Sequence, residues 1–362
     1  MEILVTGGNG LLGRHLVREL QARGDRVSVL ALPGEDTSWL EARDARVFSG
    51  DIRRPETLAA PMRGMEAVLH LAGMMGVWLP IAEYRAVNVA GTENVARAAL
   101  AEGVRRVVHV SSWTVYGMNL GCPVGEEATL APFPEPYALT KAEGDRLVQR
   151  MVERDHLPAV IVRPGTFFGP GDQLHFGRMA DRVISGRGLI VGSGRNALPF
   201  VYVSDVVQGL LLALDQPQAL GRAYNITNDS PLSQLEFLRA IAEEVGARPP
   251  WVHAPYRALY AGGAAAERLA GWTGTRRQPP LTRLGVMLFG TDNRHAIVRA
   301  RQELGFRPLV PLREGVRLAA AWYLHQRFPA PPPSPSGRPS GERPASPTPS
   351  DAVRPRAGVP GR

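Results

Sequence analysis

The chain has 362 residues, of which 44% are hydrophobic and 21% charged, and its formal net charge is +8. This length and composition fit a globular protein with a sizeable core. Residues 330–362 hold five arginines and two acidic residues, so +3 of the charge belongs to this tail and +5 to the body. The body has no basic cluster interleaved with aromatic residues, so its charge does not predict nucleic-acid binding.

The sequence predicts no disulfide, no signal peptide and no membrane span, which bears on where in the cell the protein is expected. Cys122 is the single cysteine, so we expect no internal disulfide and predict no metal site. Residues 2–5 lead directly into a predicted strand, which leaves no room for a signal peptide. The nearest approach to a membrane span, 258–272, is interrupted by Glu267 and Arg268 and falls short of the required apolar run of about 20 residues. We therefore expect a cytoplasmic protein without a transmembrane segment.

Apolar strands and amphipathic helices alternate through the first half of the chain. In chain order, strands are predicted at 2–6, 26–32, 45–49, 67–71, 106–111 and 159–163, with helices at 11–23, 84–102 and 137–155. This alternation predicts an α/β fold with a doubly wound parallel sheet, covered by helices on both faces. The uninterrupted apolar stretch at 107–110 agrees with a sheet that is buried on both sides.

The alternation ends after Pro164, where glycine, proline and aromatic residues become frequent. The predicted organisation is a larger α/β domain at 1–165 with a returning segment near 200–225, and a smaller region at 166–199 and 226–328. A strand at 200–203 is expected to return to the neighbourhood of the sheet, and a helix is expected at 233–245. Residues 329–362 are rich in Pro, Ser and Arg and are predicted to be disordered, because they lack the large apolar residues needed to form a core.

A glycine-rich turn joins the first predicted strand to the first predicted helix. Gly7, Gly10 and Gly13 form the pattern G-x-x-G-x-x-G, which is one residue wider at its start than G-x-G-x-x-G. Such glycines permit a tight turn and let backbone N–H groups approach a pyrophosphate at the helix N-terminus. The position at the first strand–helix junction favours dinucleotide binding over a simple tight turn. We therefore predict that 1–165, with its returning segment, is a dinucleotide-binding Rossmann domain and that 166–199 and 226–328 form the substrate-binding region.

The choice between NAD and NADP depends on the end of the second predicted strand. In NAD enzymes an acidic residue there binds the ribose hydroxyls, and in NADP enzymes an arginine binds the 2′-phosphate. This chain has neither residue at that position. Glu35 and Asp36 follow in the loop and could contact the ribose or simply be solvated. We expect NAD or NADP, with NAD slightly favoured because no arginine is available. Asp51, after the third strand, could accept a hydrogen bond from adenine. Residues 70–73 end the fourth strand at the carboxyl edge of the sheet, where ligands bind in such folds.

A serine, a tyrosine and a lysine form the candidate reaction centre. Ser111 and Ser112 end the fifth predicted strand, while Tyr137 and Lys141 open a helix and share one of its faces. A free tyrosine has a pKa of about 10, and a neighbouring ammonium group lowers it by stabilising the phenolate. The same lysine can bind the ribose of a nicotinamide, and a serine hydroxyl can orient a substrate oxygen.

Together, these motifs resemble the extended short-chain dehydrogenase/reductases over residues 1–328. The motifs that carry the resemblance are the glycine turn, Asp51, 70–73, 88–92, 111–112, Tyr137-x-x-x-Lys141, 163–171 and 202–205. The resemblance implies that Tyr137 is the general acid/base, that Lys141 activates it and binds the ribose, and that Ser112 binds the reacting oxygen. Ser112 is preferred to Ser111 because of its offset from 115–117.

The resemblance also implies cofactor contacts and an assembly. The residues expected to contact the dinucleotide are Gly7, Gly10, Leu11, Leu12, Gly13, Asp51, Ile52, Leu71, Ala72, Gly73, Asn88, Tyr137, Lys141, Pro164 and Thr166. Asn88 is expected close to the site, where it could order neighbouring residues. Relatives pair the helices at 84–102 and 137–155 across a four-helix interface, so a homodimer is expected; the alternative is a monomer.

Two branches of the family compete. Sugar-nucleotide epimerases and dehydratases commonly carry an asparagine at the position of Thr166 and a diphosphate-binding arginine at that of Leu198. A diphosphate needs charged donors, so an apolar residue there favours the branch of 3β-hydroxysteroid dehydrogenases and β-keto-acid reductases. Segments 279–283 and 300–308 resemble that branch. Met74, Met75, Val77, Trp78 and Leu79 could line an apolar pocket, or only pack.

The expected function is therefore a nicotinamide-dependent interconversion of a secondary alcohol and a ketone on a mainly apolar substrate. An epimerase or dehydratase that regenerates its bound NAD is the main alternative. A cofactor-sensing regulator without turnover is a third class, and the presence of Ser112, Tyr137 and Lys141 argues against it.

Overall fold

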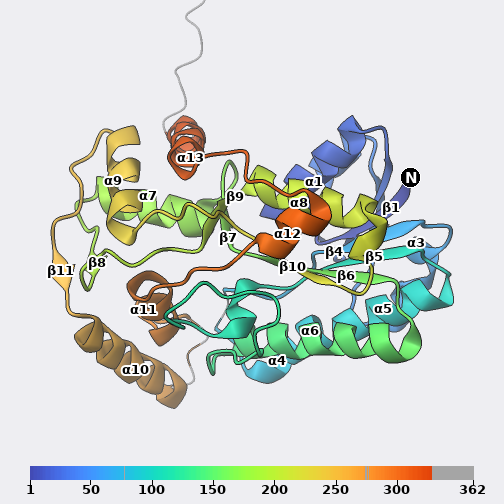
Figure 1. The fold of residues 1–362 in the computed structure, drawn as a ribbon, viewed down its shortest axis with the longest axis horizontal. Helices are drawn as coiled ribbons and strands as arrows, with labels where there is room; N and C mark the ends of the chain where they lie inside the picture. The colour runs from blue at the N-terminus through green and yellow to red at the C-terminus, as the bar shows by residue number, and fades with distance from the viewer. Residues whose placement is uncertain (77, 274, 276, 328–362) are drawn as a thin grey trace, which may run out of the picture.

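A seven-stranded parallel sheet forms the centre of the molecule (Figure 1), as seen in a computed structural model that describes residues 1–327 except 77, 274 and 276. The strand order is β10-β6-β5-β4-β1-β2-β3. The strands are β1 (Glu2–Thr6), β2 (Arg26–Ala31), β3 (Arg46–Ser49), β4 (Ala67–His70), β5 (Arg106–Val110), β6 (Ala159–Pro164) and β10 (Ala223–Ile226). The predicted doubly wound sheet is confirmed.

The order of the strands defines where a ligand can bind. The chain leaves β1 towards β2 and β3 and then crosses back to β4 on the other side of β1. In an open parallel sheet such a reversal opens a crevice beyond the carboxyl ends of the two central strands, and ligands bind there. The glycine turn, which follows β1, and residues 71–73, which follow β4, both lie at this crevice.

Helices cover both faces of the sheet (Figure 1). One face is covered by α1 (Leu11–Ala22) and α8 (Val203–Asp215), and the opposite face by α5 (Thr92–Ala101) and α6 (Pro136–Asp155). The short helices α2 (Ser38–Glu41), α3 (Ala59–Met62) and α4 (Ile81–Arg85) lie in the connections. All of the central strands β1, β4, β5 and β6 are therefore buried on both sides, in agreement with their apolar sequences.

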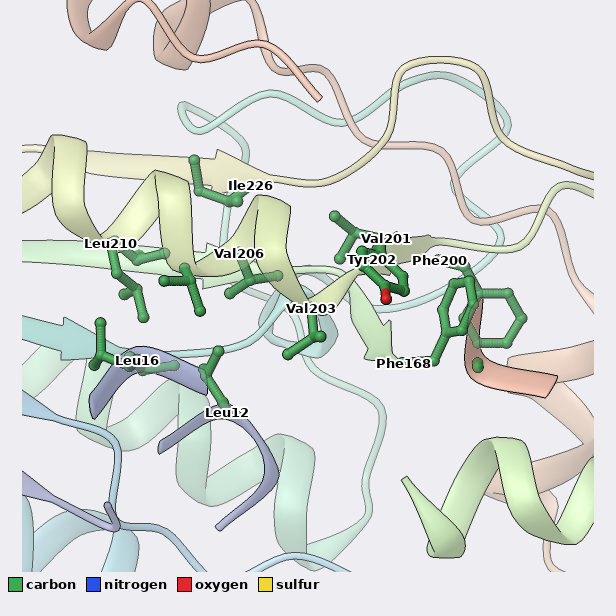
Figure 2. Close-up of a cluster of buried hydrophobic side chains, with 14 of the residues drawn as sticks. Leu12, Leu16, Phe168, Phe200, Val201, Tyr202, Val203, Val206, Leu210 and Ile226 are labelled. Carbon is green, nitrogen blue, oxygen red and sulfur yellow. The ribbon is translucent and has the colours of Figure 1, made fainter. Parts of the chain in front are cut away.

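The largest hydrophobic cluster joins α1 to α8 (Figure 2). Leu12 and Leu16 are four residues apart on α1 and face Val203, Val206 and Leu210 of α8. Four of these five side chains are fully excluded from solvent, and Leu12 is 5% exposed. Spacings of three and four residues place each set on one side of its helix, so the two apolar stripes pack against each other.

Aromatic rings continue this cluster beyond the end of the sheet (Figure 2). Phe168 of β7 (Thr166–Phe168) and Phe200 of β9 (Phe200–Tyr202) both contact Phe237 of α9 (Gln234–Glu244). The ring centroids of Phe200 and Phe237 are 4.2 Å apart. These contacts fix the C-terminal elements to the carboxyl edge of the sheet, where a substrate would have to enter.

The remaining α-helices and strands of the described residues belong to the C-terminal part of the molecule. In chain order they are α7 (Arg178–Ile184), β8 (Ile190–Val191), β11 (His253–Ala254), α10 (Tyr256–Thr273), α11 (Arg283–Gly290), α12 (Val298–Leu304) and α13 (Leu312–Arg327). Ser233 caps α9 in a reciprocal capping box with Glu236, so the predicted start of that helix agrees with its cap. The predicted tail at 329–362 lies outside the described residues. Within the described part of the chain, no helix is long and apolar enough to cross a membrane.

Two sequence expectations differ in detail from the structure. The strand expected at 200–203 is β9, which pairs with β7 in a separate two-stranded sheet and not with a strand of the main sheet. The strand that joins the main sheet is β10, which pairs with β6 and lies at the end of the returning segment expected near 200–225. The single helix expected at 84–102 is interrupted by a π-helical turn, η2 (Ala86–Gly91), which separates α4 from α5.

The packing of α1 on α8 can be tested by truncating Leu16. Because Leu16 is fully buried, Leu16→Ala should lower the free energy of unfolding by about 2–5 kcal/mol, measured by urea denaturation. Leu174 is 61% exposed, and Leu174→Ala should change the same quantity by less than about 0.5 kcal/mol. Equal denaturation midpoints for the two variants would contradict the assigned core.

Candidate functional site

Close backbone approaches require the glycines of the first turn. Gly7 has a φ of +70°, and a Cβ there would lie 2.8 Å from the backbone nitrogen of Ala72. A Cβ on Gly13 would overlap the carbonyl oxygen of Gly7. Gly10 caps α1 without a side-chain hydrogen bond, so the N–H groups of the first turn are available to an anion. The side chain of Leu12 points into the core, so only its backbone could meet a ligand.

A chain of hydrogen bonds fixes the ends of β1 and β4. Thr92 donates its hydroxyl proton to the carbonyl oxygen of Asn88 (2.9 Å) and must therefore accept from Nε2 of His70 (3.0 Å). Nδ1 of His70 is then the acceptor for the hydroxyl of Thr6 (2.7 Å), which itself accepts from the N–H of Ala72 (3.2 Å). Burial lowers the pKa of His70 to about 3, so the imidazole is neutral and can hold this arrangement.

The loop after β2 folds back onto the glycine turn. Asn9 donates a hydrogen bond to one carboxylate oxygen of Glu35 (2.9 Å), and the N–H of Leu32 donates to the other (3.0 Å). Arg14 donates to Asn9 and lies over the ring of Trp39. A carboxylate therefore lies beside the glycine turn after β2, which is where an acidic residue reads the ribose of NAD.

Asp51 and Ile52 follow β3 on the same side of the crevice. Asp51 is buried, and Arg53 donates to both of its carboxylate oxygens from Nε, at 3.1 and 2.9 Å. This hydrogen-bonded arginine holds the pKa of Asp51 below its usual range. The carbonyl oxygen of Ile52 accepts from Asn94 of α5 (2.9 Å). Asp51 is therefore charged and already paired, and an adenine contact would add to the bond with Arg53.

Two sequence signals explain why α6 begins at Pro136, which places Tyr137 in its first turn. Pro136 occupies the first helical position, and the carboxylate of Glu135 accepts from the N–H groups of Tyr137 (3.1 Å) and Ala138 (3.2 Å). A proline at this position and a capping acceptor before it are strong helix-start signals. Tyr137 and Lys141 consequently occupy successive turns on one face of the helix.

The end of β5 meets this face of α6. The hydroxyl of Ser112 lies close enough to Tyr137 to lower the pKa of its phenol, and it accepts a hydrogen bond from the N–H of Thr114 (3.2 Å). Nζ of Lys141 donates to the carbonyl oxygen of Val110 (2.6 Å). The structure therefore brings together the serine, tyrosine and lysine that the sequence singled out.

The protonation states at this cluster suit a proton donor. Burial raises the pKa of Tyr137 to about 12, against the opposing effect of the Ser112 hydroxyl. Burial lowers the pKa of Lys141 to about 8, while the charge of Asp145 acts in the opposite direction. At neutral pH the phenol is protonated and Lys141 is mostly charged. A phenol next to an ammonium group can donate its proton and leave a stabilised phenolate.

Asn88 connects the crevice to α6. Its side-chain oxygen accepts from the N–H of Met74 (2.7 Å), and its amide group donates to the carbonyl oxygen of Met74 (3.1 Å) and to Thr140 (3.0 Å). A Cβ on Gly144 would lie 2.6 Å from the carbonyl oxygen of Asn88, so only glycine allows this approach of α6 to η2. Asn88 therefore orders the loop after β4.

The glycine turn and the reaction centre flank one loop. Gly7 contacts Ala72, and a Cβ on Gly73 would lie 3.8 Å from Nζ of Lys141. Residues 71–73 thus run between the pyrophosphate side and Lys141, in the crevice beyond β4. The contacts of Leu71, Ala72 and Gly73 with a dinucleotide stay a prediction.

Residues after β6 lie at the other rim of the crevice. Pro164 ends β6, and the hydroxyl of Thr166 accepts a hydrogen bond from Nε1 of Trp113 (3.0 Å). Leu198 is 1% exposed and belongs to the main hydrophobic cluster. Leu198 therefore offers no charged or hydrogen-bonding group to a diphosphate.

One buried pair was missed by the sequence reasoning. Asp145 and Arg163 form an ion pair of 2.8 Å, with side chains 0% and 2% exposed, and Asp145 also accepts from Ser111 (2.6 Å). The spacing of Lys141 and Asp145, again four residues, could have indicated it, but an exposed helical pair has the same spacing. No group of three metal-ligating side chains is found among the described residues.

This fold and site define a nicotinamide-dependent oxidoreductase of the extended short-chain type. The model of the NAD dependent epimerase/dehydratase family matches residues 3–227, more than half of the chain. The chain therefore belongs to this family, and the predicted resemblance is confirmed.

Known relatives include reductases, dehydrogenases and epimerases. The chain is 33% identical over 325 residues to a 2-alkyl-3-oxoalkanoate reductase of Stenotrophomonas maltophilia, covering 88% of this chain and 98% of that one. A 3β-hydroxysteroid dehydrogenase/Δ5→4-isomerase of Mycobacterium tuberculosis is 31% identical over 345 residues, 89% of this chain and 90% of that one.

Solved structures agree with this placement. The crystal structure of gox2253 has a TM-score of 0.76 and 30% identity, and the match covers 90% of this chain and 98% of that one. The UDP-glucose 4-epimerase of Thermus thermophilus, solved with NAD, has a TM-score of 0.71 and 25% identity, with 91% and 100% coverage. Reductases and dehydrogenases precede epimerases among the relatives by sequence, so the predicted oxidoreductase class is confirmed.

A methyl group at Gly13 tests the glycine turn. Gly13→Ala would place a Cβ against the carbonyl oxygen of Gly7, so the affinity for reduced dinucleotide should fall by at least about tenfold, or about 1.4 kcal/mol. Titration of nicotinamide fluorescence measures this. Gly125 has open space around its Cβ position, and Gly125→Ala should bind like the wild type. Wild-type affinity in Gly13→Ala would refute the pyrophosphate site.

Proposed function

We propose that this protein interconverts a ketone and a secondary alcohol on a mainly apolar substrate, with a nicotinamide dinucleotide as the hydride donor or acceptor. The observation that carries the proposal is the meeting of Ser112, Tyr137 and Lys141 at the carboxyl edge of the sheet. This cluster lies beside the crevice that begins at the glycine turn, so a cofactor and a carbonyl group could meet there.

The residues at the crevice fit a dinucleotide. The backbone approaches at Gly7 and Gly13 leave no room for side chains, and the N-terminus of α1 has no side-chain cap. We assign the pyrophosphate to Gly7, Gly10, Leu11, Leu12 and Gly13, and the adenine to Asp51 and Ile52. The nicotinamide half is assigned to Leu71, Ala72, Gly73, Asn88, Tyr137, Lys141, Pro164 and Thr166. When bound, the nicotinamide supplies or accepts the hydride at the substrate carbon.

In the direction of reduction, Tyr137 is the proton donor to the carbonyl oxygen. The Ser112 hydroxyl donates a hydrogen bond to the same oxygen and holds it next to the phenol. Lys141 remains charged, stabilises the phenolate that Tyr137 becomes and binds the ribose hydroxyls. In the direction of oxidation the same phenolate accepts the alcohol proton.

The chemistry of the substrate is inferred from two observations. Leu198 is buried in the core, so the position where sugar-nucleotide enzymes commonly hold a diphosphate cannot do so here. Because the reductase of S. maltophilia is named for a 2-alkyl-3-oxoalkanoate, we favour a β-keto acid or a similar apolar ketone. Val77, predicted as a pocket residue, lies outside the described residues.

NAD is the favoured cofactor. The carboxylate of Glu35, held by Leu32 and Asn9 beside the glycine turn, would bind the free ribose hydroxyls of NAD and repel the 2′-phosphate of NADP. This interpretation agrees with the lack of an arginine at the end of β2. We further infer a cytoplasmic homodimer that pairs α5 and α6 with those of a second copy, as the family resemblance implies.

Replacing Tyr137 tests the assigned proton donor. Tyr137→Phe removes the transferable proton and should lower kcat by about 10²–10⁴-fold. Binding of the dinucleotide should change little, because Lys141 and the glycine turn remain. Steady-state kinetics and fluorescence titration of the same preparation measure both. A kcat within twofold of wild type would remove the basis of the proposal.

A substrate panel distinguishes the dehydrogenase from an epimerase. Long-chain β-keto acids or 3-ketosteroids, offered with NADH and NADPH, should oxidise NADH in proportion to product and prefer it to NADPH. UDP-glucose should neither turn over nor raise the melting temperature, whereas a ligand at about 100 times its dissociation constant stabilises by about 2.7 kcal/mol. Epimerisation of UDP-glucose with unchanged nicotinamide absorbance would establish the alternative.

A further inference from the structure

Three side chains on one face of α6 lie against three consecutive residues of the neighbouring strand end. Tyr137 lies beside Ser112, Lys141 donates to the carbonyl oxygen of Val110, and Asp145 accepts from the hydroxyl of Ser111. The helix residues are spaced by four, so each comes from a successive turn. Two of these contacts involve the proposed reacting groups, and the third, made by Asp145, has no part in the proposed chemistry.

The carboxylate of Asp145 is fully buried, and each of its oxygens accepts two hydrogen bonds. Arg163 of β6 donates to both of its oxygens, each at 2.8 Å, and Ser111 and Gln149 add further bonds of 2.6 Å. A buried ion pair generally stabilises a fold no better than well-packed apolar residues would. Because this pair lies next to Ser111 and one turn after Lys141, we look for a role other than stability.

The pair also reaches the segment that follows Ser112. Arg163 donates to the hydroxyl of Tyr116 (2.7 Å), which lies in the 3-10 helix η3 (Trp113–Tyr116), and Tyr116 donates to Asn225 of β10 (2.8 Å). Asp145 thus links α6 to residues on both sides of Ser112, namely Ser111 directly and Tyr116 through Arg163. Movement of the end of β5 away from α6 would break these bonds first.

We propose that Asp145 is a positioning residue, which holds the end of β5 against α6 so that the hydroxyl of Ser112 stays within reach of Tyr137, and which offsets the buried charge of Arg163. The expected change in kcat rests on the proposed function. The expected loosening of the end of β5 rests only on the contacts of Asp145. Asp145 does not contact substrate or cofactor in this account.

The charges around Lys141 predict how replacing Asp145 should change the pH dependence of the activity. The titratable or charged groups that surround Lys141 or lie behind it are, element by element, His70 of β4, His109 of β5, Arg163 of β6, and Tyr137 and Asp145 of α6. Burial keeps both histidines neutral, since it lowers the pKa of each. Asp145 is the group that raises the pKa of Lys141 against burial, so its neutralisation should make Lys141 lose its proton at lower pH.

The first test is Asp145→Asn in the full chain. At about pH 7 we expect a roughly 10- to 100-fold fall in kcat for reduction of a β-keto acid with NADH, with KM and NADH affinity within about threefold of wild type. In the wild type, the rate should fall as pH rises through about 8, the pKa of Lys141; in the variant the same fall should begin at lower pH. An unchanged kcat and pH profile would overturn the proposal.

The matched control is Asp205→Asn. Asp205 of α8 is also a buried carboxylate, 1% exposed, and accepts hydrogen bonds from the backbone N–H groups of Leu309 (3.0 Å) and Val310 (3.3 Å) in a different part of the molecule. Its replacement should lower the melting temperature without moving the pH profile. Equal kinetic effects of the two variants would show that Asp145 acts only through general stability.

A second variant covers the case in which Asp145→Asn fails to fold. The double replacement Asp145→Leu with Arg163→Met removes the pair without leaving a buried charge, which proteins commonly tolerate. It should fold and bind NADH but remain at least about tenfold slower in kcat. Wild-type turnover in this variant would overturn the proposal.

Hydrogen–deuterium exchange tests the positioning independently of any substrate. Amides of residues 110–117 should exchange faster in the double variant than in wild type or Asp205→Asn, because Ser111 and Tyr116 lose their partners. Unchanged exchange there would overturn the inference even if no ketone proved to be a substrate. Absence of turnover in the wild type, with the faster exchange present, would instead reject only the proposed function.

Discussion

The attachment of α6 to the end of β5 is the constraint on which the rest of the site depends. A helix that lies on a sheet through apolar contacts alone can shift by a fraction of an ångström at little cost, whereas a proton transfer needs donor and acceptor within hydrogen-bond reach. Here Lys141 reaches a strand carbonyl and Asp145 reaches a strand hydroxyl. These two polar contacts leave Tyr137 little freedom relative to Ser112.

Close packing also governs the dinucleotide crevice. Gly7, Gly13 and Gly144 each allow a backbone to approach another segment where a side chain would interfere, and a Cβ on Gly73 would lie 3.3 Å from the side-chain oxygen of Asn88. The close contacts bring the turn after β1, the loop after β4, the π-helical turn and α6 into one layer around the crevice. A cofactor bound there would contact mostly backbone at one end and the Tyr–Lys pair at the other, so its orientation would be fixed by shape as well as by charge.

Local chemistry explains what could be predicted from the sequence. The glycine pattern, the paired Tyr137 and Lys141 and the apolar strands are short-range signals, and the sheet, the crevice and the family followed from them. The two-strand pairing of 200–202, the addition of β10 to the sheet and the Asp145–Arg163 pair depend on which distant segments meet. A charged residue that is buried by such a meeting cannot be distinguished in the sequence from one on a surface. The roles of the individual site residues and the division into domains stay predictions.

The π-helical turn between α4 and α5 has a consequence for how this segment can vary. Each residue of an α-helix advances the side chains by about 100°, and a π turn holds one residue more than the regular repeat. Because the π turn already absorbs one extra residue, deleting one residue from 86–91 would convert it to regular helix with little rotation of α5, and Val95 and Ala99 would stay buried. The deletion would remove the local bulge in which Asn88 lies opposite Met74. The extra residue of this segment therefore serves the position of Asn88 rather than the packing of α5, and its loss should impair the site more than the fold.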